Sequence, residues 1–221
     1  MNTKELPRMI DLSCVRTNSS LKELKEMVAM AKKYHVICVF AMPCYTPWLV
    51  EQMKDYPDIL IGGTTGFPSG ADLPETKAET ARKLVDMGCG EIDMVINVGA
   101  LIGGDYELVE RDIAGVKKEC GDIPLKVILE TPLLTDEQIA MGAKLAVKNG
   151  ANFVKTGTGW MGSATVHAIE VIKEAIGNTA RIKAAGGVKD LATIEAMVNA
   201  GCTRFGIGTK SAQAIFDEAK L

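Results

Sequence analysis

The sequence is poor in histidine, in excess positive charge and in closely spaced cysteines, and each shortage argues against a kind of function. Its 221 residues include only His35 and His167, so a zinc site built from histidines is not expected. Lysine and arginine total 25 against 28 acidic residues, which gives a formal net charge of -3 and no extended basic face for nucleic acid or an anionic membrane. The six cysteines lie far apart without a C-x-x-C motif, and we expect them to be reduced and mostly buried.

Long apolar runs are also missing. No segment approaches the length of a membrane span, and Met1 to Pro7 carry charges and a proline where a signal peptide would be apolar. We therefore expect a cytoplasmic protein without nucleic-acid or membrane partners. With 47% hydrophobic residues, the chain can fill one core, and we expect residues 1–221 to form a single domain. Self-association is left open, because no long amphipathic excess marks an interface.

What the sequence does contain is an alternation of short apolar runs with helix signals. Strands are expected near residues 9–13, 36–40, 59–63, 91–96, 125–130, 153–156, 182–184 and 204–207. A helix is expected after each of them, near residues 18–34, 47–54, 74–87, 105–119, 135–149, 165–176, 190–199 and 211–219. Gly88, Gly150 and Gly201 each follow a helix and precede a strand, as C-terminal capping glycines do.

Eight strands that are each followed by a helix must pair in parallel, since every crossover returns the chain to the same end of the sheet. The pattern favours an α/β fold, a closed (β/α)₈ barrel. An open, doubly wound sheet is the competing fold, but no G-x-G-x-x-G turn follows the first strand.

Five charged residues lie within the otherwise apolar strands. They are Asp93, Lys126, Glu130, Lys155 and Lys183. A closed barrel has no free edge, so charges that point inward need one another or a ligand, and reacting groups in such barrels lie at the carboxyl ends of the strands. We expect these side chains to converge, although a lysine at a strand end can also extend its ammonium into water.

Two of these lysines have matching settings. Lys155 leads into Thr156-Gly157-Thr158-Gly159, and Lys183 leads into Ala184-Ala185-Gly186-Gly187. If both point inward from neighbouring strands, like charge and lost hydration lower their pKa, and a fall of about three units would leave one amine neutral near pH 7. A neutral amine attacks an aldehyde or ketone to form an iminium ion, which promotes carbon–carbon bond cleavage or formation. Asp93 could move the protons, through a water.

The last two strand–helix turns are typical of an anion site. Gly186-Gly187-Val188-Lys189 and Gly206-Ile207-Gly208-Thr209-Lys210 each combine glycines with a lysine. Barrels often bind phosphate at these two positions with backbone N–H groups and a helix N-terminus. We expect the substrate and its phosphate to contact Asp11, Lys126, Thr158, Gly186, Gly187, Gly208 and Thr209.

Five of these segments together resemble the deoxyribose-phosphate aldolase family in order and spacing. They are Glu91-Ile92-Asp93-Met94-Val95-Ile96-Asn97, Leu125-Lys126-Val127-Ile128-Leu129-Glu130-Thr131, Phe153-Val154-Lys155-Thr156, Gly162-Ser163-Ala164-Thr165 and Ile182-Lys183-Ala184-Ala185-Gly186-Gly187-Val188, and residues 61–71 resemble the family's third-strand loop. The resemblance implies a class I aldolase on a TIM barrel, a lyase of carbohydrate catabolism. It implies Lys155 as the Schiff-base lysine, Lys183 as the lysine that lowers its pKa, and Asp93 as the proton-relay acid. It further implies reversible cleavage of 2-deoxy-D-ribose 5-phosphate to D-glyceraldehyde 3-phosphate and acetaldehyde, without a metal or organic cofactor.

The chain departs from the family pattern in several places. Leu12-Ser13 stands where the family usually has His-Thr, Gly157 where it has serine, and Gly208-Thr209-Lys210 where the turn usually ends in two serines; residues 38–43 also hold extra residues. These departures cluster where the acceptor aldehyde and its phosphate would bind. We therefore hypothesise that the donor half-reaction is retained while acceptor preference differs, so the substrate could be another sugar phosphate.

Two other functions remain open from the sequence. A barrel that isomerises or epimerises a sugar phosphate without a covalent intermediate would explain the glycine turns, but not two buried lysines. A sugar-phosphate sensor without turnover would keep the pocket, but has no need of Lys155, Lys183 and Asp93 together.

Overall fold

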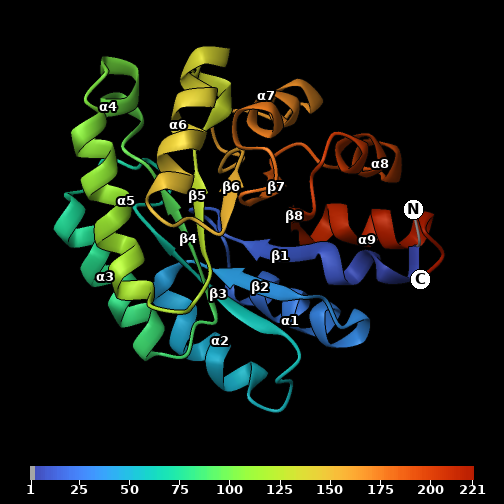
Figure 1. Ribbon diagram of the computed structural model, residues 1–221. Helices are drawn as coiled ribbons and strands as arrows, with labels where there is room; N and C mark the ends of the chain where they lie inside the picture. The colour runs from blue at the N-terminus through green and yellow to red at the C-terminus, as the bar shows by residue number, and fades with distance from the viewer. Residues whose placement is uncertain (1–2) are drawn as a thin grey trace.

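The computed structural model describes residues 3–221, and over these residues the chain forms a closed barrel of eight parallel strands surrounded by helices (Figure 1). The strands are β1 (Ile10–Cys14), β2 (Cys38–Ala41), β3 (Leu60–Thr65), β4 (Glu91–Val95), β5 (Leu125–Ile128), β6 (Phe153–Lys155), β7 (Arg181–Ala185) and β8 (Arg204–Gly208). The helices are α1 (Leu21–Tyr34), α2 (Thr46–Met53), α3 (Pro74–Asp86), α4 (Val98–Gly103), α5 (Tyr106–Cys120), α6 (Asp136–Lys148), α7 (Val166–Ile176), α8 (Leu191–Asn199) and α9 (Thr209–Glu218). Short 3₁₀ helices cover Thr3–Met9, Pro43–Tyr45 and Thr131–Leu133. The predicted (β/α)₈ barrel is confirmed.

The strands pair in chain order, and β8 closes the barrel by pairing with β1. Each connection runs over the outside of the barrel, so all eight strands end at the same mouth and deliver their last residues to it. On the outer side of the barrel, apolar side chains of the strands pack against the buried stripes of the helices, as Val127 of β5 and Val116 of α5 illustrate.

Local signals set several helix starts. Ser20 and Glu23 form a capping box at the start of α1, and Thr135 and Gln138 form another at the start of α6. The glycines expected after helices behave as predicted, since Gly88, Gly150 and Gly201 all have positive φ.

Most predicted element bounds are displaced by one to three residues. The expected helices after the first and second strands begin at Leu21 and Thr46. Three features were not predicted from the sequence: the helix α4, the three 3₁₀ helices, and the end of β5 at Ile128, which leaves Glu130 outside the strand.

Two compositional expectations can be compared with the structure. All six cysteines are free, and only Cys44 of the six is exposed. None of the helices within residues 3–221 has the length and apolar character needed to cross a lipid bilayer.

Candidate active site

Lys155 and Lys183 lie side by side at the barrel mouth because β6 and β7 pair in register, with Lys155 opposite Lys183. One carboxylate oxygen joins them: Asp93 Oδ2 accepts hydrogen bonds from Lys155 Nζ at 2.8 Å and from Lys183 Nζ at 2.7 Å. Asp93 and Lys183 are fully buried, whereas Lys155 retains 7% exposure. Of these three, Lys155 is therefore the group that a molecule entering from the mouth can reach.

Beneath Lys155, ion pairs continue through the barrel interior. We use the name charge network for the carboxylates and cations that they connect, namely Asp11, Glu91, Asp93, Lys126, Lys155, Lys183 and Arg204. Lys126 pairs with all three carboxylates, and Arg204 pairs with Asp11 and Glu91. Three carboxylates thus face four cationic side chains, so the network is electrically balanced when one lysine is neutral.

Phe40 supplies the apolar partner of two cations in the network. Lys126 Nζ lies 4.8 Å and Lys183 Nζ lies 4.4 Å from the centroid of the Phe40 ring, which are cation–π distances. The ring fits because position 62 is glycine, since a Cβ there would collide with the Phe40 ring atoms. Gly62 therefore makes room for the aromatic side chain on which the lysines rest.

The lysine best suited to be neutral is Lys155. Burial is the largest influence and lowers the pKa of Lys155 to about 8; Asp93 opposes this by raising the pKa, and Lys183 adds to the lowering. The expected combination of lost hydration and like charge is present, and lost hydration is the larger of the two. About a tenth of Lys155 is then a free amine at pH 7.

For Asp93, neighbouring charges rather than burial decide the direction in which the pKa shifts. Burial alone would raise the pKa of Asp93, but Lys126, Lys155 and Lys183 together hold it well below the usual range of an aspartate. Asp93 is thus anionic at neutral pH. It can accept a proton transiently and stabilise a cation on Lys155, but it does not store a proton as an acid.

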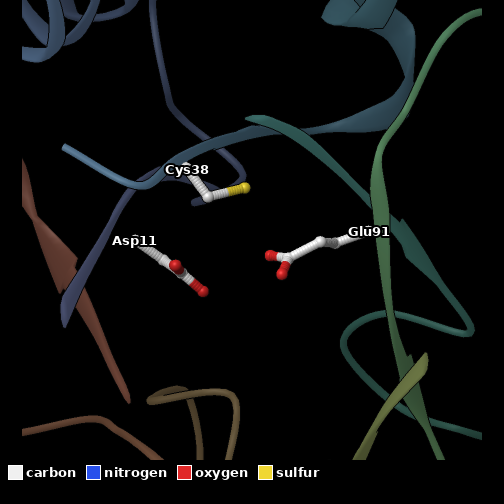
Figure 2. Close-up of side chains that lie close together, drawn as sticks. All are labelled: Asp11, Cys38 and Glu91. Atoms are coloured by element: carbon white, nitrogen blue, oxygen red, sulfur yellow. The ribbon is translucent and has the colours of Figure 1, made fainter. Parts of the chain in front are cut away.

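Three potential metal ligands lie together in the barrel interior. The ligand atoms of Asp11, Cys38 and Glu91 are within 4.8 Å of one another, and Figure 2 shows their side chains directed toward a common space. Arg204 and Lys126 already pair with both carboxylates, and burial raises the pKa of the Cys38 thiol well above its usual value. A metal ion would have to displace these cations and ionise the thiol, so the donor set fits its own lysine and arginine partners better than a metal.

Beside Lys155 opens a cavity of about 440 Å³. Its walls come from the segments that follow β1, β6, β7 and β8, and include Thr158, Gly186, Gly187, Gly208 and Thr209, five of the residues expected to contact substrate. Arg16, Lys189 and Lys210 also line it together with Glu23 and Glu26, so the cationic side chains outnumber the carboxylates on this side of the mouth.

The other two residues expected to contact substrate, Asp11 and Lys126, do not line this cavity. Both are fully buried in the charge network, where Lys126 pairs with Asp11, Glu91 and Asp93. In this structure both reach Lys155 only through the charge network, and their direct contact with substrate stays a prediction.

Glu130 is also placed differently from the expectation that the strand charges converge. Its backbone is left-handed, with φ 63°, and its carboxylate accepts hydrogen bonds from the backbone N–H and the hydroxyl of Thr158. Glu130 thus fixes the turn after β6. It is buried, with 1% exposure, so the contact with Thr158 replaces its hydration.

Sequence reasoning missed Glu91 and Arg204 as site residues. Glu91 and Asp93 are two residues apart on one strand, and side chains with that spacing point to the same face. Arg204 begins β8 and reaches across to Asp11 of β1. The i, i+2 spacing of Glu91 and Asp93 was the available signal, and an arginine at a strand end gave none.

A barrel with a partly neutral lysine at the carboxyl end of β6, held by a buried carboxylate, defines a TIM-barrel enzyme of the lyase class. Residues 9–217 match the family described as "DeoC/LacD family aldolase", and the chain belongs to this family. It is 42% identical over 206 residues to a deoxyribose-phosphate aldolase 1 of Bacillus licheniformis, covering 92% of each chain. It is 37% identical over 208 residues to a deoxyribose-phosphate aldolase of Klebsiella pneumoniae, covering 93% of this chain and 84% of the relative.

Solved structures agree with these sequence relationships. The crystal structure of a putative deoxyribose-phosphate aldolase from Coccidioides immitis superimposes with a TM-score of 0.94 at 28% identity, covering 100% of this chain and 87% of the other. The recognition of the family from its strand motifs is therefore confirmed.

Proposed function

We propose that this chain is a single-domain class I aldolase that reversibly cleaves 2-deoxy-D-ribose 5-phosphate to D-glyceraldehyde 3-phosphate and acetaldehyde. The relatives named deoxyribose-phosphate aldolase support the substrate. The observation that carries the mechanism is Lys155 itself, a lysine with a pKa of about 8 that lies on the cavity wall, with Nζ 2.8 Å from Asp93 Oδ2.

In the cleavage direction, the neutral Nζ of Lys155 attacks the C1 aldehyde of the open-chain sugar and forms a carbinolamine. Loss of water then gives an iminium ion. The positive charge of this ion occupies the position of the protonated ammonium, where the Asp93 carboxylate lies at hydrogen-bond distance.

The iminium ion accepts the electron pair of the C2–C3 bond. Removal of the proton from the C3 hydroxyl breaks that bond and releases glyceraldehyde 3-phosphate, which leaves an enamine on Lys155. Protonation of the enamine at C2 and hydrolysis of the iminium release acetaldehyde and restore the amine. We assign to Asp93 the orientation of Nζ and transient acceptance of protons, and to Lys183 the maintenance of the lowered pKa of Lys155 and of the Asp93 charge.

The phosphate would lie against the turns after β7 and β8. Gly186 and Gly187 have positive φ, and α9 begins at Thr209 after the N-cap residue Gly208, which has no side chain to cap it, so its first backbone N–H groups lack a side-chain acceptor. Lys210 in the first turn of α9 and Arg16 add positive charge on the same cavity wall.

The test is reduction of a covalent adduct. Incubation with acetaldehyde and borohydride should add one reduced ethyl group to Lys155, identified by peptide mass spectrometry. Lys155→Arg should abolish both the adduct and cleavage of deoxyribose 5-phosphate, while Lys144→Arg, at an exposed position on α6, should change neither. An unlabelled wild-type chain that still converts a sugar phosphate would favour the non-covalent isomerase instead.

A second possibility keeps the same chemistry and changes the acceptor. The family's usual residues are replaced by Gly157 and Lys210 near the cavity, where Lys210 and Trp160 form part of the wall. Relative cleavage rates for deoxyribose 5-phosphate, free deoxyribose and other sugar phosphates distinguish the two; full activity on deoxyribose 5-phosphate alone argues against altered preference.

A further inference from the structure

The cavity beside Lys155 occupies only one side of the barrel mouth. Its walls come from the segments after β1, β6, β7 and β8, and none of the described residues that line it belongs to the loops after β2 to β5. The strand ends on that other side are covered: Thr65, Ile96 and Thr131 are all buried. The side of the mouth formed by the loops after β2 to β5 is therefore covered by other residues.

An aromatic pair spans this closed half. Phe67, in the loop after β3, meets Trp160, in the turn after β6, with ring centroids 6.1 Å apart in an edge-to-face arrangement at 86°. Since β4 and β5 lie between β3 and β6 in the barrel, the contact bridges the carboxyl ends of the strands that carry Asp93 and Lys126. We name Phe67 and Trp160 the aromatic roof.

The structure fixes Trp160 in this position through a chain of hydrogen bonds. The Trp160 backbone N–H donates to the Thr158 hydroxyl oxygen at 3.0 Å, and Thr158 donates through its own N–H and hydroxyl to the buried carboxylate of Glu130. Glu130 occupies a left-handed conformation that is unfavourable for a residue with a side chain. The turn that carries Trp160 is thus held by the strained backbone and the buried carboxylate of Glu130.

The indole itself is not placed for its own hydrogen bonding. Trp160 Nε1 is buried and finds no hydrogen-bond partner among the described residues, which is costly for a tryptophan. Trp160 also lines the cavity together with Lys155. Its ring thus contacts Phe67 of the loop after β3 while the residue lines the cavity that contains Lys155.

We propose that Trp160, as part of the aromatic roof, is a specificity-determining residue that blocks the β4–β5 side of the mouth to the acceptor aldehyde. This inference rests on the proposed aldolase function. An acceptor bound to the enamine on Lys155 can extend only toward the turns after β7, β8 and β1, which favours an aldehyde whose longer, anionic substituent points to these turns. The second substituent on the carbon next to the carbonyl, a small hydroxyl in glyceraldehyde 3-phosphate, would then face the roof, so a bulkier group there is disfavoured.

The experiment compares two acceptors for acetaldehyde addition: glyceraldehyde 3-phosphate, whose second substituent next to the carbonyl is a hydroxyl, and the uncharged isobutyraldehyde, whose second substituent is a methyl group. Trp160→Ala should raise the ratio of kcat/KM for isobutyraldehyde to that for glyceraldehyde 3-phosphate by about tenfold, the discrimination that a pocket wall provides for a group of this size. Trp160→Phe retains a ring and should keep the ratio near the wild-type value. Trp48→Ala is the matched control, because Trp48 is the other tryptophan and lies on α2, outside the cavity walls.

Phe67→Leu removes the other half of the roof and should shift the ratio in the same direction, which keeps the test decisive if Trp160→Ala does not fold. Borohydride trapping of acetaldehyde is run on every variant. If Lys155 of the wild type is not labelled, the proposed function fails. If Lys155 is labelled in wild type and variants but neither roof substitution changes the acceptor ratio, the inference about Trp160 is overturned and the proposed function stands.

Discussion

At the scale of single residues, the chemistry depends on opposing influences on the amine of Lys155. Burial and Lys183 lower its pKa, whereas Asp93 raises it, with about 8 as the result. The Asp93 carboxylate therefore works against the neutral amine and in favour of the iminium ion that follows. A site built in this way holds the amine partly protonated until the substrate arrives and then stabilises the cation that the substrate creates.

These influences predict the pH dependence of adduct formation. The reactive species is the unprotonated amine, so the rate of borohydride-trapped labelling by acetaldehyde should rise with pH through about 8 and then level off. Asp93→Asn removes the influence that raises the pKa and should move this rise to lower pH. Lys183→Met removes an influence that lowers the pKa and should move it to higher pH. Shifts of both variants in the same direction would contradict the assignment.

Gly187 offers a residue-scale test of the phosphate site. Its φ is +76°, and a Cβ at this position would collide with Ser163, so Gly187→Ala should distort the turn after β7. We expect the KM for deoxyribose 5-phosphate to rise by about tenfold or more, as loss of a charge-assisted contact would produce, with acetaldehyde labelling of Lys155 retained. Steady-state kinetics and labelling on the same preparation measure both.

The control for this substitution is Gly177→Ala. Gly177 also has positive φ, at +57°, but a Cβ there would meet no atom within 4 Å, and it ends α7 away from the cavity. It imposes similar backbone strain without the collision. An equal rise of KM in both variants would show that strain alone, rather than the phosphate site, is responsible.

At the scale of elements, α3 and α5 are joined by a buried ion pair that also holds the end of β4. Lys77 Nζ donates to Asp112 Oδ2 at 2.6 Å and to the Val95 carbonyl, and Asp112 accepts from the Asn97 N–H. Burial lowers the pKa of Lys77 and raises that of Asp112, so both groups are taken out of water at a cost. The pair connects two helices to the strand that carries Asp93.

Removing one partner of this pair should be more harmful than removing both. Asp112→Asn leaves a buried ammonium without its counter-charge and should lower the free energy of unfolding by about 3–5 kcal/mol. The double variant Lys77→Met, Asp112→Leu should recover much of that loss, because no uncompensated charge remains. Urea unfolding followed by circular dichroism measures the wild type, Asp112→Asn and the double variant, and a double variant no more stable than Asp112→Asn would argue against the pairing.

Sequence patterns predicted those elements whose signals are local. Capping residues at Ser20 and Thr135 and glycines after helices gave helix starts and ends, and the alternation of the apolar runs gave the barrel. Helix α4 was not predicted because its sequence, Val98 to Gly103, is short, apolar and without helical periodicity. The end of β5 was misplaced because Leu129 continues its apolar run and Glu130 follows Lys126 at an even spacing, and only the 3₁₀ turn that begins at Thr131 shows where the strand stops.

The residues of the site also differ in whether the sequence could indicate them. Asp93, Lys126, Lys155 and Lys183 were conspicuous as charges within apolar strands, so the sequence indicated which residues to consider. It could not indicate burial: Lys126 is fully buried and does not line the cavity, and Arg204 reaches its partner Asp11 only because β8 closes against β1. Contacts between residues distant in the chain, such as that of Phe67 with Trp160, leave no local pattern to detect.

At the scale of the whole molecule, closure of the barrel coincides with the charge network. The β1–β8 seam carries the Asp11–Arg204 ion pair, and Asp11 also pairs with Lys126 and Lys183. Burial by itself would raise the pKa of Asp11, but these cations lower it far below its usual value. Asp93 is lowered in the same way. Protonation of either carboxylate therefore works against the folded barrel.

The sign of this linkage predicts sensitivity to acid. Because the folded pKa of each carboxylate is lower than the unfolded value of about 3.9, their contribution to stability is present above that pH and is lost as pH falls toward the folded pKa. Asp11→Asn should be less stable near neutral pH and should lose less stability between about pH 5 and about pH 3 than the wild type. Denaturant unfolding at several pH values measures the slope, with the exposed Asp55→Asn as control; an unchanged slope in Asp11→Asn would contradict the linkage.

The charge balance inside the barrel also restricts how this sequence can diverge. Three acidic and three permanently positive side chains share partners so closely that neutralising one leaves its neighbours uncompensated in the buried interior of the barrel. We therefore expect substitutions at these positions to occur in pairs, in which an acidic residue and the basic residue beside it are replaced together. Among descendants of a common ancestor, Asp11 and Arg204 should vary jointly or not at all.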